Sequence, residues 1–170
     1  MPSPESSARA RAQRILEIVG LDEASMFLEH VSRPGDEVRP TDVGWLIDVQ
    51  FIFRSSTGAR VLDSPNRRGA PEPRLLIQEW PDPHTGEPLL YNYDVTVGEF
   101  GEHFGFHLHV HESGREPYPH RQGYGVPGIK RHEEWRVVEL DRGGVLWDLV
   151  RVAFEIDNAY GVDLPSERRL

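Results

Sequence analysis

The sequence FGFHLHVH, residues 104–111, is the stretch from which the fold of this chain can be worked out. From residue 106 onward, apolar residues and histidines alternate strictly, which is the period of a β-strand whose two faces differ. We expect the apolar residues to face a core, and His107, His109 and His111 to share the opposite face. The pattern therefore predicts a row of imidazoles on one side of a sheet.

Histidines are concentrated in this part of the chain, since six of the eight lie between His103 and His132. The chain has no cysteine, so any metal must be bound by histidine and carboxylate ligands, and no disulfide-linked partner is expected. The 19 basic and 28 acidic residues give a net charge of −9, which disfavours a broad electrostatic contact with nucleic acid. A local basic site remains compatible with that charge.

Further strands are predicted on the N-terminal side of the histidine strand. Alternation of apolar and polar residues, broken by turn-forming clusters, indicates strands at residues 44–54, 59–62, 74–80 and 89–97. The turns fall at residues 55–58 and 81–86, and residues 64–73 have the composition of a polar loop. Short turns between consecutive strands favour antiparallel pairing.

Helices are predicted at both ends of the chain. Apolar stripes of helical period indicate two N-terminal helices and a C-terminal amphipathic helix, at residues 5–20, 22–31 and 145–160. Residues 113–134 contain too many glycines and prolines for a central strand and are predicted to form a long loop, whereas residues 135–140 have a strand-like pattern. The predicted fold is α+β with a mostly antiparallel sheet. It comprises a helical extension (1–43), an α+β domain (44–163) and a polar tail (164–170).

The histidine strand and the strand before it are expected to form a hairpin. Pairing Val97 with Phe104 places Asp94 opposite His107 and Asn92 opposite His109. A carboxylate beside a histidine orients its imidazole, as in a general base or behind a metal ligand. The alternative is a solvated polar face with no site.

Metal binding is one chemistry that these residues allow. Two histidines two positions apart on a strand can reach one zinc ion, but three in a row cannot converge, because same-face positions are about 6.6–6.8 Å apart. At most two of the row should therefore bind one ion, with Glu116, His120 or His132 completing the ligands.

The spacing of His109, His111, Glu116 and Gly123 resembles the first sequence motif of the metal-binding cupins, although His103 stands where that motif has a glycine. This resemblance implies a divalent metal such as zinc bound by His109, His111 and Glu116.

Cleavage of a phosphodiester without metal is the second chemistry, with His107, His109, His120 and Asp94 as the acid–base residues. The residues from 113 to 132 also mix cations with aromatics, which suit phosphate contact and base stacking. The predicted substrate-binding residues are Arg115, Tyr118, Arg121, Tyr124, Arg131 and His132.

Residues 91–94 (YNYD), 106–110 (FHLHV) and the pair His120-Arg121, followed by a closing helix, resemble the TumE-like toxin group of bacterial toxin–antitoxin loci. The resemblance covers residues 48–161 and implies an RNA-directed toxin with an antitoxin-like protein partner. No apolar run suits a signal peptide or a membrane span, so a cytoplasmic protein without membrane contact is expected. Our leading hypothesis is a histidine-dependent nuclease, and the alternatives are a cupin-like metal protein and a non-catalytic interaction module.

Overall fold

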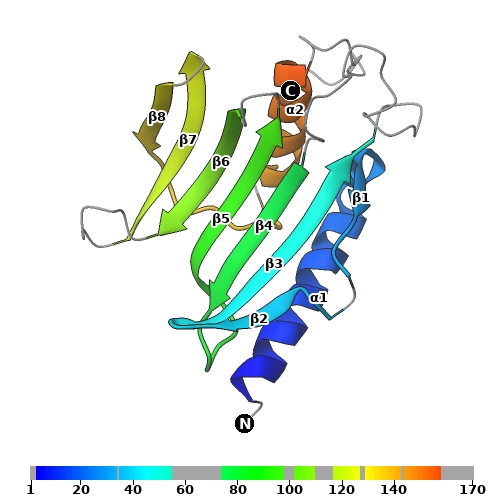
Figure 1. Cartoon of the computed structure of the whole chain (residues 1–170), viewed down its shortest axis with the longest axis vertical. Coiled ribbons are helices and arrows are strands. Elements are labelled where there is room, and N and C mark those ends of the chain that lie inside the picture. The colour runs from blue at the N-terminus through cyan, green and yellow to red at the C-terminus, as the bar shows by residue number, and fades with distance from the viewer. Residues whose placement is uncertain are drawn as a thin grey trace.

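The computed structural model describes residues 3–33, 35–54, 74–97, 102–109, 117–126, 129–142 and 144–157. In this part of the chain, eight strands form one antiparallel sheet, and α1 and α2 pack on one of its faces (Figure 1). The strand order is β1-β3-β4-β5-β6-β7-β8, and β2 also pairs with β3. The predicted α+β class with a mostly antiparallel sheet is thus confirmed. The elements are α1 (Pro4–Leu21), the 3₁₀-helix η1 (Glu23–Phe27), β1 (Leu28–His30), β2 (Val38–Thr41), β3 (Gly44–Phe53), β4 (Arg74–Pro81), β5 (Pro88–Val97), β6 (Glu102–His109), β7 (Tyr118–Val126), β8 (Ile129–Glu134) and α2 (Val145–Asp157).

Helix α1 begins with a capped first turn, because the hydroxyl of Ser3 accepts a hydrogen bond from the backbone N–H of Ser6 and Pro4 follows the cap. Its buried side carries small residues in the N-terminal half, Ala8 and Ala12, and branched residues in the C-terminal half, Ile15, Ile18 and Val19. This side packs against β3 and β2.

The second predicted N-terminal helix is not confirmed. Residues 23–27 form only a 3₁₀-helix, in which the Asp22 carboxylate accepts from the backbone N–H of Ala24 at 2.8 Å. Residues 28–30 and 38–41 then pair with β3 as strands, since the edge of a long strand offers backbone partners that an isolated short helix lacks. The predicted domain boundary at residue 43 falls within the resulting β2–β3 hairpin.

The predicted long loop at residues 113–134 is wrong for its described part, which forms the β7–β8 hairpin. The proline in β7 is tolerated for a geometric reason. The carbonyl of Pro119 accepts a hydrogen bond from Trp135 N at 3.0 Å. The carbonyl and the backbone nitrogen of one strand residue point to the same side, so the nitrogen of Pro119 also faces β8. Its lack of an N–H therefore removes no hydrogen bond to β6. Gly123 lies opposite Phe104 of β6.

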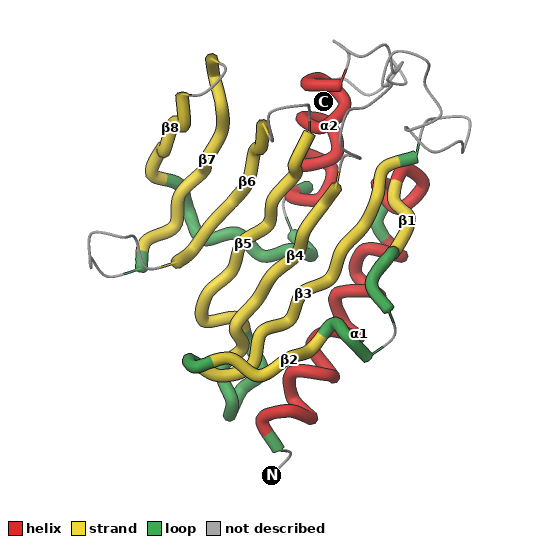
Figure 2. The backbone as a smooth tube through the Cα atoms, viewed as in Figure 1, coloured by secondary structure: helices red, strands yellow, loops and turns green. Residues whose placement is uncertain are grey.

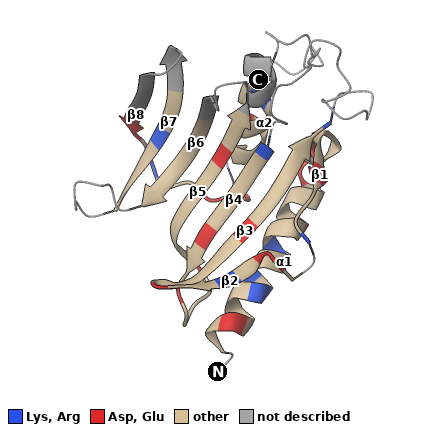
Figure 3. Cartoon of the chain, in the orientation of Figure 1, with Lys and Arg blue, Asp and Glu red and all other residues tan. Residues whose placement is uncertain are grey.

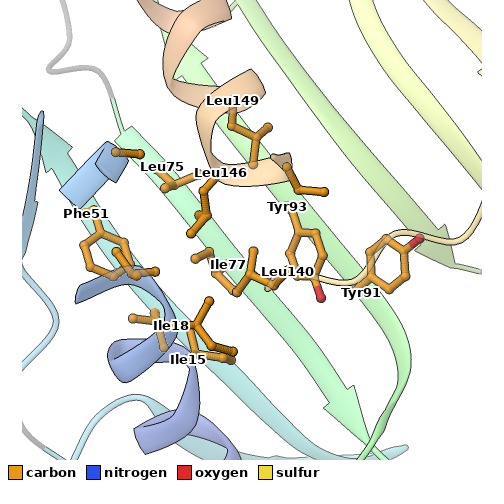
Figure 4. Close-up of a cluster of buried hydrophobic side chains, with 14 of the residues drawn as sticks. Ile15, Ile18, Phe51, Leu75, Ile77, Tyr91, Tyr93, Leu140, Leu146 and Leu149 are labelled. Atoms are coloured by element: carbon orange, nitrogen blue, oxygen red, sulfur yellow. The ribbon is translucent and has the colours of Figure 1, made fainter. Parts of the chain in front are cut away.

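The hydrophobic core lies between the sheet and the two helices (Figure 4). The apolar faces of β3 and β5 line this core, since Val49, Phe51, Tyr91 and Tyr93 are buried there. Residues 135–140 were predicted as a strand, but they form no strand and instead cross the helix-bearing face of the sheet (Figure 2). The backbone N–H of Val138 in this segment donates to the hydroxyl of Tyr91 at 3.0 Å.

A buried ionic network joins α1 to the sheet. The guanidinium of Arg11 donates two hydrogen bonds to the carboxylate of Glu79, at 2.7 and 2.9 Å, and the hydroxyl of Tyr93 donates a third at 2.6 Å. Glu79 has no exposed surface, so these donors compensate its desolvation. Burial, together with the charge of Glu79, raises the pKa of Tyr93 well above its ordinary value.

The predicted turn at residues 55–58, the strand at 59–62, the loop at 64–73 and the tail at 164–170 lie outside the described residues. Neither described α-helix is both long and apolar enough to cross a lipid bilayer.

Candidate metal centre

The face of the sheet opposite the helices carries the histidine cluster. In β6, Phe106 is buried against the core, and His107 and His109 point to the other face, as the alternation predicted. Strand β7 adds His120, which lies directly opposite His107 in the β6–β7 pairing. Three histidines from two neighbouring strands therefore share one patch of the sheet.

The three imidazoles are close enough to share a ligand. Their ring centroids are 5.3 Å apart for His107 and His109, 5.2 Å for His107 and His120, and 5.0 Å for His109 and His120. One nitrogen from each ring lies within 4.8 Å of the other two. His107 and His120 are only 4% and 1% exposed, so the cluster is far more buried than a solvated polar face.

Hydrogen bonds fix which nitrogens carry protons. Nε2 of His107 lies 2.7 Å from Oδ1 of Asp94, and a carboxylate only accepts, so Nε2 donates and the lone pair of the neutral ring sits on Nδ1. Nδ1 of His120 lies 3.1 Å from the carbonyl of Tyr118 and must donate, which leaves the lone pair on the buried Nε2. Both rings thus have an electron-pair donor away from their anchoring bond.

Buried polar atoms without a hydrogen-bond partner in the described part of the chain occur at the cluster. They include Nδ1 of His107 and Oδ1 of Asn92, which lies across β5–β6 from His107. Buried polar atoms are nearly always satisfied, so a pair of exceptions beside one another is a feature of a binding site.

The contact between Asp94 and His107 was predicted, but by a different register. Asp94 lies opposite Gly105 rather than His107, and Asn92 lies opposite His107, so the pairing is shifted by two residues. The carboxylate reaches diagonally over the glycine. A Cβ at Gly105 would lie 2.1 Å from Oδ1 of Asp94 and 2.7 Å from Nε2 of His107. The hydrogen bond therefore requires glycine at this position.

Among the predicted substrate-binding residues, Tyr118 lies beside the cluster and Arg121 does not. The ring of Tyr118 is 4.8 Å from that of His120. Arg121 lies opposite Phe106 on the helix-bearing face, where its guanidinium bonds to Glu133 and stacks 4.5 Å from the ring of Trp135. It is directed away from the histidines.

The remaining predicted site residues do not add described side chains to the cluster. His111, Arg115 and Glu116 lie outside the described residues, as do the side chains of Tyr124, Arg131 and His132, whose backbones belong to the β7–β8 hairpin. The structure brings together the four predicted acid–base residues, His107, His109, His120 and Asp94. Asn92 was expected opposite His109 and lies opposite His107 instead. Gly105 was not among the predicted site residues, although the glycine within the FGFH stretch was a signal for it.

Three convergent imidazoles suit a divalent metal better than an isolated histidine pair does. A tetrahedral ion with bonds of about 2.0–2.1 Å holds its nitrogen ligands about 3.4 Å apart, so modest rotations of these side chains would bring their nitrogens to that spacing. The carboxylate of Asp94 behind His107 is the support that metal-bound histidines usually have.

No protein family, characterised protein or solved structure shows significant similarity to this chain.

Proposed function

We propose that this protein binds a divalent metal of the zinc class through His107, His109 and His120, with Asp94 orienting His107. The observation that carries the proposal is the buried Nδ1 of His107, which holds a lone pair and has no hydrogen-bond partner among the described residues. A metal ion is a common occupant of such a position, because imidazole donates its lone pair to zinc.

Charge on this face favours a metal over metal-free cleavage of RNA. Acid–base cleavage of a phosphodiester needs a cation to bind the phosphate and stabilise the transition state. On the histidine-bearing face of β5, β6 and β7, the described side chains include the Asp94 carboxylate and no Arg or Lys. Figure 3 shows the described β6 free of Lys and Arg, and the one arginine of β7 belongs to the opposite face.

Three histidine ligands leave a tetrahedral ion one further position, which is the composition of catalytic rather than structural zinc sites. A bound ion would act there as a Lewis acid towards an anionic or carbonyl substrate. We therefore extend the proposal to a metal-dependent hydrolytic activity. His109, the most exposed of the three, would face the substrate side, while Asp94 and the buried rings hold the geometry. A toxin-like action on RNA with an antitoxin-like partner in the cytoplasm stays a sequence-based prediction, which toxicity on expression would test.

The test is metal binding by chelator-stripped protein, measured by equilibrium dialysis with zinc and by the visible absorption of cobalt. We expect about one ion per chain, and we expect His107→Ala and His120→Ala each to reduce binding strongly, since each removes one of three ligands. The matched control is His84→Ala, because His84 is exposed in the β4–β5 turn and far along the chain from the cluster.

Stability provides a second measurement. A ligand that binds only the folded state stabilises it by about 2.7 kcal/mol at a concentration of 100 times its Kd. Zinc should therefore raise the midpoint of thermal unfolding of the wild type and of the His84 variant, but not that of the His107 variant. Wild-type protein that binds zinc no better than the His107 and His120 variants would refute the proposal.

A further inference from the structure

One cavity of the described structure is lined mainly by apolar residues and by none of the three histidines. Its volume is about 650 Å³, within the range of ligand-binding pockets. It forms where the first turn of α1, the β2–β3 turn, the β4–β5 turn and the residue before β7 meet. Figure 1 shows the start of α1 and these two turns at the same end of the sheet.

The wall of this cavity consists mainly of tryptophan and proline. Trp45 and Trp80 contribute two indoles, each partly exposed, and Pro81, Pro83 and Pro117 lie beside them. Proline walls offer no backbone N–H and are rigid. An indole presents a flat apolar surface and one N–H donor, so a cavity of this composition binds apolar groups and can donate hydrogen bonds to a few carbonyls.

Large aliphatic side chains extend the apolar surface beyond the cavity. Val43 and Leu89 belong to its lining, yet 78% and 56% of their surfaces are exposed. They rank among the most exposed large hydrophobic residues of the described chain, and they occur together. An apolar patch of this kind beside a cavity is typical of a surface that contacts another molecule.

The rim of the cavity is acidic. Asp42 and Asp82 are chain neighbours of lining residues, and the carbonyl of Glu87 accepts a hydrogen bond from the backbone N–H of Asp82 at 2.7 Å in the same turn. No described Lys or Arg adjoins a lining residue in the chain. The carboxylate of Asp82 accepts hydrogen bonds from the backbone N–H groups of His84 and Thr85, at 2.8 and 2.9 Å, which fixes the turn. An occupant with positive charge at its ends would match this rim.

We propose that this cavity, which we call the Trp–Pro cavity, binds an extended, proline-containing segment of another protein, with arginine or lysine flanking the prolines. Proline-rich segments adopt the polyproline II conformation, have few backbone donors to satisfy and dock on aromatic-lined grooves. A strand would need backbone pairing that the side-chain wall of this cavity does not provide. The acidic rim selects basic residues at the ends of the segment. This inference is independent of the metal centre.

The four tryptophans of the chain provide two probes in the cavity and two control signals outside it. The probe is the synthetic peptide acetyl-Arg-Pro-Leu-Pro-Pro-Leu-Pro-Arg-amide, titrated into ¹⁵N-labelled full-length protein. We expect the indole N–H signals of Trp45 and Trp80 to shift in a saturable way, while those of Trp135 and Trp147 do not, because Trp147 packs against Phe27 and Trp135 lies beside Arg121. The same peptide with glutamate in place of arginine should bind at least tenfold more weakly.

Variants on the exposed rim test the surface without disturbing the core. Val43→Asp and Leu89→Asp should each weaken binding of the arginine peptide at least tenfold, whereas Val137→Asp, at another exposed position, should not. Asp42→Asn combined with Glu87→Gln should reduce the preference for arginine over glutamate. The inference is overturned if millimolar peptide shifts neither Trp45 nor Trp80, if all four indoles shift alike, or if both peptides bind equally. It is also overturned if the two signals shift with protein concentration alone, which would identify a second copy of the chain as the occupant.

Discussion

Replacing Gly105 by alanine tests the construction of the histidine site most directly. The added methyl group would lie 2.1 Å from Oδ1 of Asp94 and 2.7 Å from the main-chain oxygen of Tyr93, and neither distance is tolerable. The carboxylate must move and give up its bond to His107, which is worth about 1.5–3 kcal/mol for a charged partner. The carbonyl can retreat only if β5 moves, and overpacking of this kind typically costs about 1–3 kcal/mol. About 0.4–1 kcal/mol of this loss is offset, because alanine leaves the unfolded chain fewer conformations than glycine does.

The free energy of unfolding of metal-free Gly105→Ala should therefore fall by about 2–5 kcal/mol. With a urea m-value of about 2 kcal/mol/M, the midpoint of unfolding moves by about 1–2.5 M. Zinc affinity should fall about 10–100-fold as well, which is the usual cost of losing the partner behind a histidine ligand. The assays are urea unfolding followed by tryptophan fluorescence and zinc binding by equilibrium dialysis.

Gly123→Ala is the matched control. Gly123 also lies within a strand next to β6, but a Cβ there would be 3.4 Å from Cδ2 of Phe104, an ordinary contact. Its stability should change by less than about 1 kcal/mol and its zinc affinity should be unchanged. If Gly105→Ala behaves like Gly123→Ala in both assays, the carboxylate does not hold His107 across the glycine and the description of the site is wrong.

Two further predictions concern the buried network beneath α1. Arg11→Ala should lower the free energy of unfolding by about 3–5 kcal/mol, because it leaves the carboxylate of Glu79 buried without its charged partner. Arg14→Ala removes an exposed ion pair and should lower the free energy of unfolding by only about 0–1 kcal/mol. Equal losses for the two variants in urea unfolding would contradict the network. Burial raises the pKa of Tyr93, so the folded state holds the phenol proton more tightly than the unfolded state does. The stabilisation that this proton provides is fully present below pH 10 and should be lost as the pH rises above 10. Tyr93→Phe should reduce this alkaline loss in unfolding experiments between pH 9 and 11, and an unchanged slope would count against it.

The faces of the strands were predictable from the sequence, because a period of two is a local property. The apolar alternation through Val49 and Phe51, and through Phe106 beside the histidines, selects the core side whatever the neighbouring strands are. The class of fold followed from these patterns and from the helical stripe of α1. The same local reasoning placed Asp94 on the histidine face.

Register and edge strands were not predictable in this way, because they depend on distant partners. The two-residue shift between β5 and β6 places the carboxylate over Gly105, and no local pattern specifies that pairing. The β7–β8 hairpin contains Pro119 and several glycines, which as a local composition indicate a loop. The edge of β6 provides the backbone bonds that outweigh this composition, and only then does His120 reach His107.

Strand β5 connects the proposed metal centre to the contact between α1 and the sheet. Tyr93 and Asp94 are adjacent, so one peptide unit carries on one face the hydroxyl that bonds to Glu79 and, through it, Arg11 of α1, and on the other the carboxylate that bonds to His107. Tightening either contact restrains the same backbone and so favours the other, which is a reciprocal coupling between two sites. A filled histidine site should therefore slow amide hydrogen exchange in α1, on the far side of the sheet, without any ligand touching that helix.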